Sequence, residues 1–153
     1  MKVFNGIYRV WATILTAAVV LQIFFAGYGA FSAAHKLDKD GSTIDQDGFN
    51  ASFDPHIATG YFIWLGGIIF LLLSFGTRTK AKILRALGVA ALLTLQVLLA
   101  WIGYGVPYVA GGLHPINAFI ILGFLASITY REWKGKETAE APEAAAVATA
   151  PPA

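Results

Sequence analysis

The sequence predicts an all-α fold: a polytopic membrane bundle of four helices made of two parallel two-helix repeats. The first supporting observation is composition, because 57% of the 153 residues are hydrophobic and only 13% are charged. The second is that the apolar residues form long blocks. A hydrocarbon layer of about 30 Å needs roughly 20 apolar residues in a helix. Four segments have or approach this length, at about 7–33, 56–76, 83–106 and 113–130.

An internal repeat is the third observation and divides these spans into two halves. The stretch LQIFFAGYGAF at 21–31 resembles LQVLLAWIGYGVPY at 95–108, so the first span corresponds to the third. In each half a histidine heads the next span, His56 in the second and His114 in the fourth. Because corresponding spans cross in the same direction, the predicted repeat is parallel, with a pseudo-twofold axis along the membrane normal.

Basic residues predict the orientation of the bundle. Nine of the eleven lysines and arginines lie before or in the first turn of the first span, between the second span and the first turn of the third, or after the fourth, whereas only Lys36 and Lys39 lie in the other loops. The positive-inside rule therefore places both termini in the cytoplasm. The predicted transmembrane domain is 1–137, and the Ala/Pro-rich segment 138–153 is expected to be a disordered cytoplasmic tail.

The chain contains no cysteine. This excludes disulfides, thiolate-ligated iron–sulfur clusters and the covalent attachment of c-type haem, so any haem is held without a covalent link. The net charge of +2 mainly reflects topology, and no nucleic-acid partner is indicated. The lipid bilayer is the expected surrounding.

The two histidines are the main candidates for a functional site. Asp54 is expected to cap the second span with Pro55 at its first position, which places His56 in the first turn, and Pro115 suggests a similar place for His114. An ionisable group in a membrane span usually faces the bundle interior. A symmetric pair facing one axis suits haem b with two axial imidazoles. A zinc site would need His35 as a third imidazole, and His35 is expected to be solvated.

Small and amide side chains extend the predicted site. Gly60 and Gly112 would leave room for a macrocycle, although small residues also serve ordinary helix packing. Gln22 and Gln96 form a second repeat-related pair in the membrane interior. Their expected role is hydrogen bonding between helices, and the alternative is a polar contact with haem or a quinone headgroup.

This arrangement resembles one four-helix half of haem A synthase, with a histidine heading the second span, LQ in the third, and LHPINA opening the fourth. It is also similar to an uncharacterised family of small bacterial four-helix membrane proteins with a Gln…LH-x-INA signature. The resemblance covers about 7–130 and implies that His56 and His114 are haem ligands in a bacterial inner membrane. Haem A synthase has a glutamate three residues before a catalytic histidine, where this chain has Phe53. The resemblance thus implies that this chain corresponds to the half of haem A synthase that only holds a cofactor, and not to a catalytic half.

Two functions from different classes remain. The favoured one is a membrane haem b protein, with His56 and His114 as ligands, that transfers electrons or holds haem; a quinone or a redox protein would be its partner. The alternative is a cofactor-free accessory subunit of a respiratory or transport complex. An oxidase acting on haem or a quinone has no convincing acid or base in the sequence, so a non-enzymatic role is favoured. The chain would act alone, as a homo-oligomer or in a larger complex.

Overall fold

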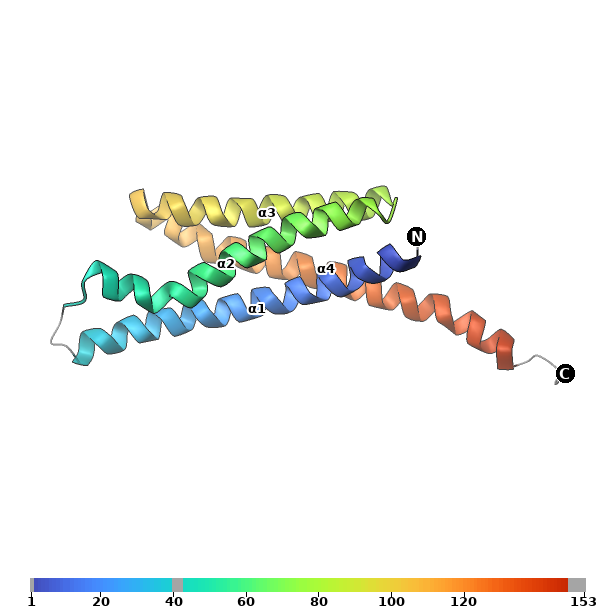
Figure 1. The fold of residues 1–153 in the computed structure, drawn as a ribbon, viewed down its shortest axis with the longest axis horizontal. Helices are drawn as coiled ribbons and strands as arrows, with labels where there is room; N and C mark the ends of the chain where they lie inside the picture. The colour runs from blue at the N-terminus through green and yellow to red at the C-terminus, as the bar shows by residue number, and fades with distance from the viewer. Residues whose placement is uncertain (1, 40–42, 149–153) are drawn as a thin grey trace.

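The computed structural model describes residues 2–39 and 43–148, except for the side chains of 39, 104, 107, 108 and 136–148. In this part of the chain the fold is all-α, with α1 (Lys2–Lys39), α2 (Gln46–Phe75), α3 (Lys80–Gly105) and α4 (Pro107–Ala148). Successive helices run in opposite directions (Figure 1). The predicted all-α class and the four helices are therefore confirmed.

All four helices are long and apolar enough to cross a membrane, as judged by length and composition. Their outward faces carry large hydrophobic side chains, such as Phe31, 80% exposed, and Phe62, 73% exposed. A helix that is apolar on its outer face as well as its inner face is typical of a membrane span rather than of a water-soluble bundle. The fold therefore has the features of a multi-pass membrane protein.

The helices pack as a four-membered ring. α1 and α3 each pack along both α2 and α4, whereas within the described residues the backbones of α1 and α3, and those of α2 and α4, do not come close to each other. The core between them is apolar and draws on all four helices. Its buried members are Tyr8, Ala12, Leu15, Val19, Ile63, Phe70, Ala86, Val89, Leu93, Ile121, Leu125 and Ile128. Consequently α2 and α4, which carry the two candidate histidines, lie diagonally across the bundle.

A polar cluster ties three helices together at the end that carries the N-terminus. The Lys82 ammonium of α3 lies 2.6 Å from a carboxylate oxygen of Glu132 on α4 and donates to Asn5 of α1 at 3.1 Å. The hydroxyl of Tyr8 donates to the Lys82 main-chain oxygen at 3.2 Å. The lysine and glutamate side chains are only 16% and 9% exposed, so each charge needs the other as its partner.

The second helix begins earlier than predicted. Asp45, not Asp54, is its N-cap, and the Asp45 carboxylate accepts a 2.8 Å hydrogen bond from the Gly48 N–H. Pro55 therefore lies inside α2, which changes direction in its first part (Figure 1), and His56 falls in the third turn. A proline removes one helical hydrogen bond but can be accommodated with a bend. The expected first-turn position of His56 was wrong.

The last helix also differs from expectation at both ends. α4 begins at Pro107, so His114 lies about two turns inside it instead of at its start. At the other end α4 continues to Ala148, so 138–148 is helical where a disordered tail was expected. Alanine and glutamate, which are common in this segment, have high helix propensity and let the helix continue. Residues 149–153 lie outside the described part of the chain.

Candidate functional site

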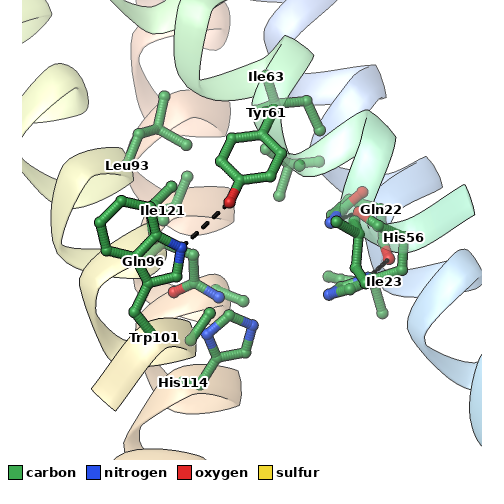
Figure 2. A pocket seen from close by; sticks show the side chains of 16 residues that line it. Gln22, Ile23, His56, Tyr61, Ile63, Leu93, Gln96, Trp101, His114 and Ile121 are labelled. Carbon is green, nitrogen blue, oxygen red and sulfur yellow. Dashed lines mark hydrogen bonds between the residues drawn. The ribbon is translucent and has the colours of Figure 1, made fainter. Parts of the chain in front are cut away.

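The two candidate histidines face each other across the bundle centre. Their ring centroids lie 6.2 Å apart, with an angle of 65° between the ring planes. Both side chains are half-buried and line one cavity (Figure 2). Because α2 and α4 do not pack against each other, these imidazoles bridge a diagonal that the helices themselves leave open.

The spacing of the imidazoles matches that of two ligands on one metal. Metal–imidazole bonds are about 2 Å long, and adding the distance from each bonding nitrogen to its ring centre gives a centroid separation of about 6 Å. The 6.2 Å separation is close to this value. The angle between the ring planes does not prevent such binding, because each ring can rotate about its own metal–nitrogen bond.

The cavity between the histidines has a volume of about 160 Å³. An apolar cavity of about 150 Å³ holds a benzene molecule, so the space is that of a single ring. Most lining atoms are apolar, and all four helices contribute to the wall. A few polar groups converge on this apolar space, which is the usual character of a small-molecule or cofactor site. The lining residues are Val19, Gln22, Ile23, His56, Ile57, Gly60, Tyr61, Ile63, Leu93, Gln96, Val97, Ala100, Trp101, His114, Ala118 and Ile121.

Gln22 of α1 holds His56 through two contacts in opposite directions. The His56 ring nitrogen Nδ1 lies 3.2 Å from the Gln22 main-chain oxygen, and the Gln22 side-chain Nε2 donates to the His56 main-chain oxygen at 2.7 Å. The hydroxyl of Thr59 donates to Gln22 Oε1. Since a carbonyl can only accept, His56 carries its proton on Nδ1. Its Nε2 then keeps a lone pair for a ligand, as metal-bound histidines with carbonyl partners do.

Gln96 of α3 lies beside His114 in the other half, with a different set of contacts. Its Oε1 accepts a 2.7 Å hydrogen bond from Asn117 Nδ2, which also donates to the Leu92 main-chain oxygen at 3.0 Å. The Gln96 main-chain carbonyl lies beside the His114 ring, as that of Gln22 lies beside the His56 ring. The geometry nevertheless falls short of a hydrogen bond, so the buried His114 Nδ1 has no partner among the described residues.

Two aromatic side chains form the outward-facing, exposed edge of the cavity. Trp101 Nε1 of α3 donates to the Tyr61 hydroxyl of α2 at 3.1 Å, and Figure 2 shows this bond in front of the cavity. The side chains of Trp101 and Tyr61 are 60% and 45% exposed, respectively, whereas Ile63, Leu93 and Ile121 on the inner wall are buried. The cavity therefore opens between α2 and α3, and this aromatic pair spans the opening.

The structure brings five of the six predicted site residues together. His56, His114, Gln22, Gln96 and Gly60 line the cavity, and a Cβ added to Gly60 would lie 3.0 Å from Gln22 Nε2. Gly112 is exposed, does not line the cavity and has open space around its Cα. The small residue equivalent to Gly60 is instead Ala118, which follows His114 by four positions as Gly60 follows His56. His35 is exposed and outside the cavity lining.

Sequence reasoning missed two polar residues and the aromatic edge. Thr59 and Asn117 each follow a histidine by three positions and contact the glutamine of the same half. The shared spacing, HIAT at 56–59 and HPIN at 114–117, was a usable signal, because residues three apart lie on one helix face. Tyr61 and Trp101 gave no such signal, since their hydrogen bond joins two helices at positions that the repeat does not relate.

No group of three or more histidine, cysteine, aspartate or glutamate side chains within the described residues could hold a metal ion. A zinc ion held by protein ligands alone would need three or four of them. Two imidazoles on opposite sides suit a metal whose other ligands come from elsewhere, such as a porphyrin.

Comparison with known proteins gave no relatives: no protein-family model, curated protein or solved structure matches this chain. The function is therefore inferred from the geometry of the site.

Proposed function

We propose that this protein is a membrane haem b protein that transfers electrons or holds haem, with His56 and His114 as its two axial ligands. The observation that carries the proposal is the pair of facing imidazoles with centroids 6.2 Å apart. The contact of His56 Nδ1 with a main-chain carbonyl supports it, because this contact leaves Nε2 as the free basic nitrogen. A metal-bound histidine commonly has such a partner.

The chemistry of the donor set also fits haem. A porphyrin supplies four ligands in its plane, so the protein needs only two, and neutral imidazoles are common axial ligands. Bound haem would supply a one-electron iron couple whose potential depends on the axial ligands and the surrounding polarity. The chain's own residues would hold the ring, orient the two imidazoles and keep bulk water from the iron.

The cavity must widen before haem can bind in it. A porphyrin is much larger than the single ring that about 160 Å³ admits, so side chains must move outward when it binds. Tyr61 and Trp101 stand at the open side and are the most exposed polar members of the lining. We therefore expect haem to part this pair, with the macrocycle edge extending toward the space between α2 and α3.

The matching contacts of the two halves support a parallel two-helix repeat. In each half the side-chain oxygen of a glutamine on the first helix accepts a hydrogen bond from the polar residue three positions after the histidine of the second helix. A pseudo-twofold axis along the bundle would relate α1 to α3 and α2 to α4, which agrees with the ring of helix contacts. The resemblance to one half of haem A synthase is a separate argument for the same ligand pair.

We also propose that the bundle spans a bacterial inner membrane with both termini in the cytoplasm. The four apolar helices and the basic residues at one end support this orientation. The site then lies in the half of the membrane nearer the outer face, because His56 and His114 are closer to the α1–α2 and α3–α4 connections than to the opposite end.

Cysteine labelling tests this orientation. The chain has no native cysteine, so Gln46→Cys and Lys80→Cys each provide one exposed label site, at the start of α2 next to the α1–α2 connection and at the start of α3 next to the α2–α3 connection. A membrane-impermeant maleimide applied to intact cells should label Gln46→Cys and leave Lys80→Cys unlabelled until the cells are lysed. The reverse pattern would invert the topology.

The proposed cofactor is tested by the optical spectrum of the full chain purified in detergent after expression with ample haem. We expect a reduced-minus-oxidised difference spectrum of low-spin, six-coordinate haem b, with one haem per chain. We also expect haem titration to quench tryptophan fluorescence, because Trp101 lines the site. A folded protein that stays colourless and binds no added haem would favour the cofactor-free accessory subunit instead.

A further inference from the structure

The cavity between the helices has the size of one aromatic ring. Its volume of about 160 Å³ is close to that of an apolar cavity that holds a benzene molecule. A single ring therefore enters without moving the helices apart, whereas a porphyrin requires the cavity to widen. The ligand that fits the cavity as it stands is a small aromatic or quinonoid ring.

The opening of the cavity lies on the apolar outer surface between α2 and α3. Tyr61 and Trp101 span it through their 3.1 Å hydrogen bond (Figure 2). Leu65 lies one helical turn after Tyr61 and is 49% exposed. Leu98 lies one turn before Trp101 and is 44% exposed. In a membrane this surface meets lipid chains, so a ligand can place its ring in the cavity and leave an apolar tail outside.

His56 offers a hydrogen-bond acceptor at the wall of the cavity. Its Nδ1 donates to the Gln22 main-chain oxygen at 3.2 Å, so the other ring nitrogen, Nε2, carries a lone pair. This nitrogen has no hydrogen-bond partner among the described residues. It can therefore accept a proton-bearing group of a ligand.

Gln96 offers a hydrogen-bond donor at the same cavity. Its Oε1 accepts from Asn117 Nδ2 at 2.7 Å, and its Nε2 donates to none of the described residues. Asn117 is held in this direction by its second bond, to the Leu92 main-chain oxygen at 3.0 Å. Figure 2 shows Gln96 and His114 on one side of the cavity and His56 on the other. One acceptor and one donor are thus available to a ligand.

A phenolic hydroxyl matches both of these groups. A hydroxyl has one donor and two acceptor lone pairs, so it can donate to His56 Nε2 and accept from Gln96 Nε2. The carbonyl of a quinone can only accept, so it could use Gln96 but would leave the His56 lone pair without a partner. The site therefore favours the reduced, hydroxylated form of such a ring.

We propose, independently of the haem proposal, that the haem-free cavity binds the ring of a membrane quinol, the reduced form of a lipid-soluble quinone. The ring lies in the cavity, one hydroxyl bonds to His56 and Gln96, and the apolar tail leaves past Tyr61 and Trp101. Haem and the quinol would occupy the same space, so the two ligands exclude each other.

Calorimetric titration of the haem-free full chain in detergent with a benzoquinol that carries a decyl tail tests this site. We expect one quinol to bind per chain. The quinone form of the same probe should bind more weakly by a factor of about ten, because it forms one hydrogen bond fewer and leaves His56 Nε2 unpaired. A folded chain that binds no quinol, or binds the quinone as tightly, would overturn the inference.

A cavity-filling substitution locates the bound ring. Ala100 lines the cavity, so Ala100→Phe places a side-chain ring in the space that the quinol needs and should abolish binding. Ala91→Phe adds the same side chain at an exposed position of the same helix and should leave the affinity unchanged. Undiminished binding by Ala100→Phe would place the quinol elsewhere and contradict the inference.

Two further variants separate the acceptor from the donor. His56→Phe should weaken the quinol and not the quinone, so that the two forms bind alike. Gln96→Leu should weaken both forms by a factor of about ten and preserve their ratio. Circular dichroism checks that each variant keeps its helix content. A preference for the quinol that persists in His56→Phe would refute the role given to this histidine.

The same titration on the haem-loaded chain separates this inference from the haem proposal. We expect the loaded chain to bind no quinol, because haem fills the cavity, and persistent binding would contradict the assigned site. A chain that binds the quinol and takes up no haem would support the inference and remove the haem proposal. A chain that takes up haem but binds no quinol when haem-free would overturn the inference alone.

Discussion

Replacing either His56 or His114 by alanine should abolish the six-coordinate, low-spin spectrum of the haem-loaded protein. Each substitution removes one of two axial bonds, so the product is five-coordinate haem or a chain that has lost its haem. The change is measured by the reduced-minus-oxidised spectrum and the haem-to-protein ratio of detergent-purified variants. No other single substitution in the chain is expected to have so large an effect on the cofactor.

His35→Ala is the control for this prediction. His35 is the only other histidine of the chain, and its exposed side chain lies outside the cavity lining. The wild-type spectrum should therefore persist in this variant. Loss of the spectrum on changing His35, with His56→Ala or His114→Ala unaffected, would keep the haem but assign its ligand elsewhere.

Gln22→Leu is expected to have the largest effect on stability among the site residues that are not ligands. The change removes two bonds between α1 and α2: the 2.7 Å hydrogen bond to the His56 main-chain oxygen and the bond from the Thr59 hydroxyl, which keeps the Pro55 main-chain oxygen as an acceptor. Hydrogen bonds between membrane helices are worth about 1 kcal/mol each, so we expect a loss of about 2 kcal/mol in the free energy of unfolding. Denaturation in mixed detergent micelles measures this quantity.

Haem coordination should survive the same substitution, because the His56 ring contact uses the main-chain carbonyl of residue 22. Gln96→Leu should cost about 1 kcal/mol, since Asn117 keeps its bond to the Leu92 carbonyl. Gln46→Leu is the matched control, because this glutamine is exposed and its side chain donates to Asn50 of the same helix, outside the bundle core. A folded Gln22→Leu protein that cannot bind haem would show that Gln22 has a more direct role.

The sequence predicted the spans and the histidine pair because these depend on signals that a single chain carries. The apolar blocks have the length that a membrane requires, and the repeat placed His56 and His114 at corresponding positions. Gln22 and Gln96 were expected to bond between helices, and each does so. In these cases the pattern of residues along the chain was enough to predict which helices form and which side chains come together.

The starts of α2 and α4 and part of the cavity wall could not be predicted from the sequence. Asp54 and Pro55 have the composition of a helix start, but Asp45 caps the helix ten residues earlier, and local preferences do not decide between two such signals. Gly112 was chosen because it lies close to His114 in sequence. A helix start at Pro107 instead leaves it exposed and outside the cavity wall. The hydrogen bond of Tyr61 with Trp101 depends on how α2 and α3 pack.

The diagonal placement of α2 and α4 gives a bound ligand a mechanical role. His56 belongs to the hairpin α1–α2 and His114 to the hairpin α3–α4, and the helices that carry them do not pack against each other. A molecule that bonds to both imidazoles therefore crosslinks the two hairpins between helices whose backbones do not come close to each other. Its binding energy then adds to the association of the hairpins, so cofactor occupancy and cohesion of the bundle would rise and fall together.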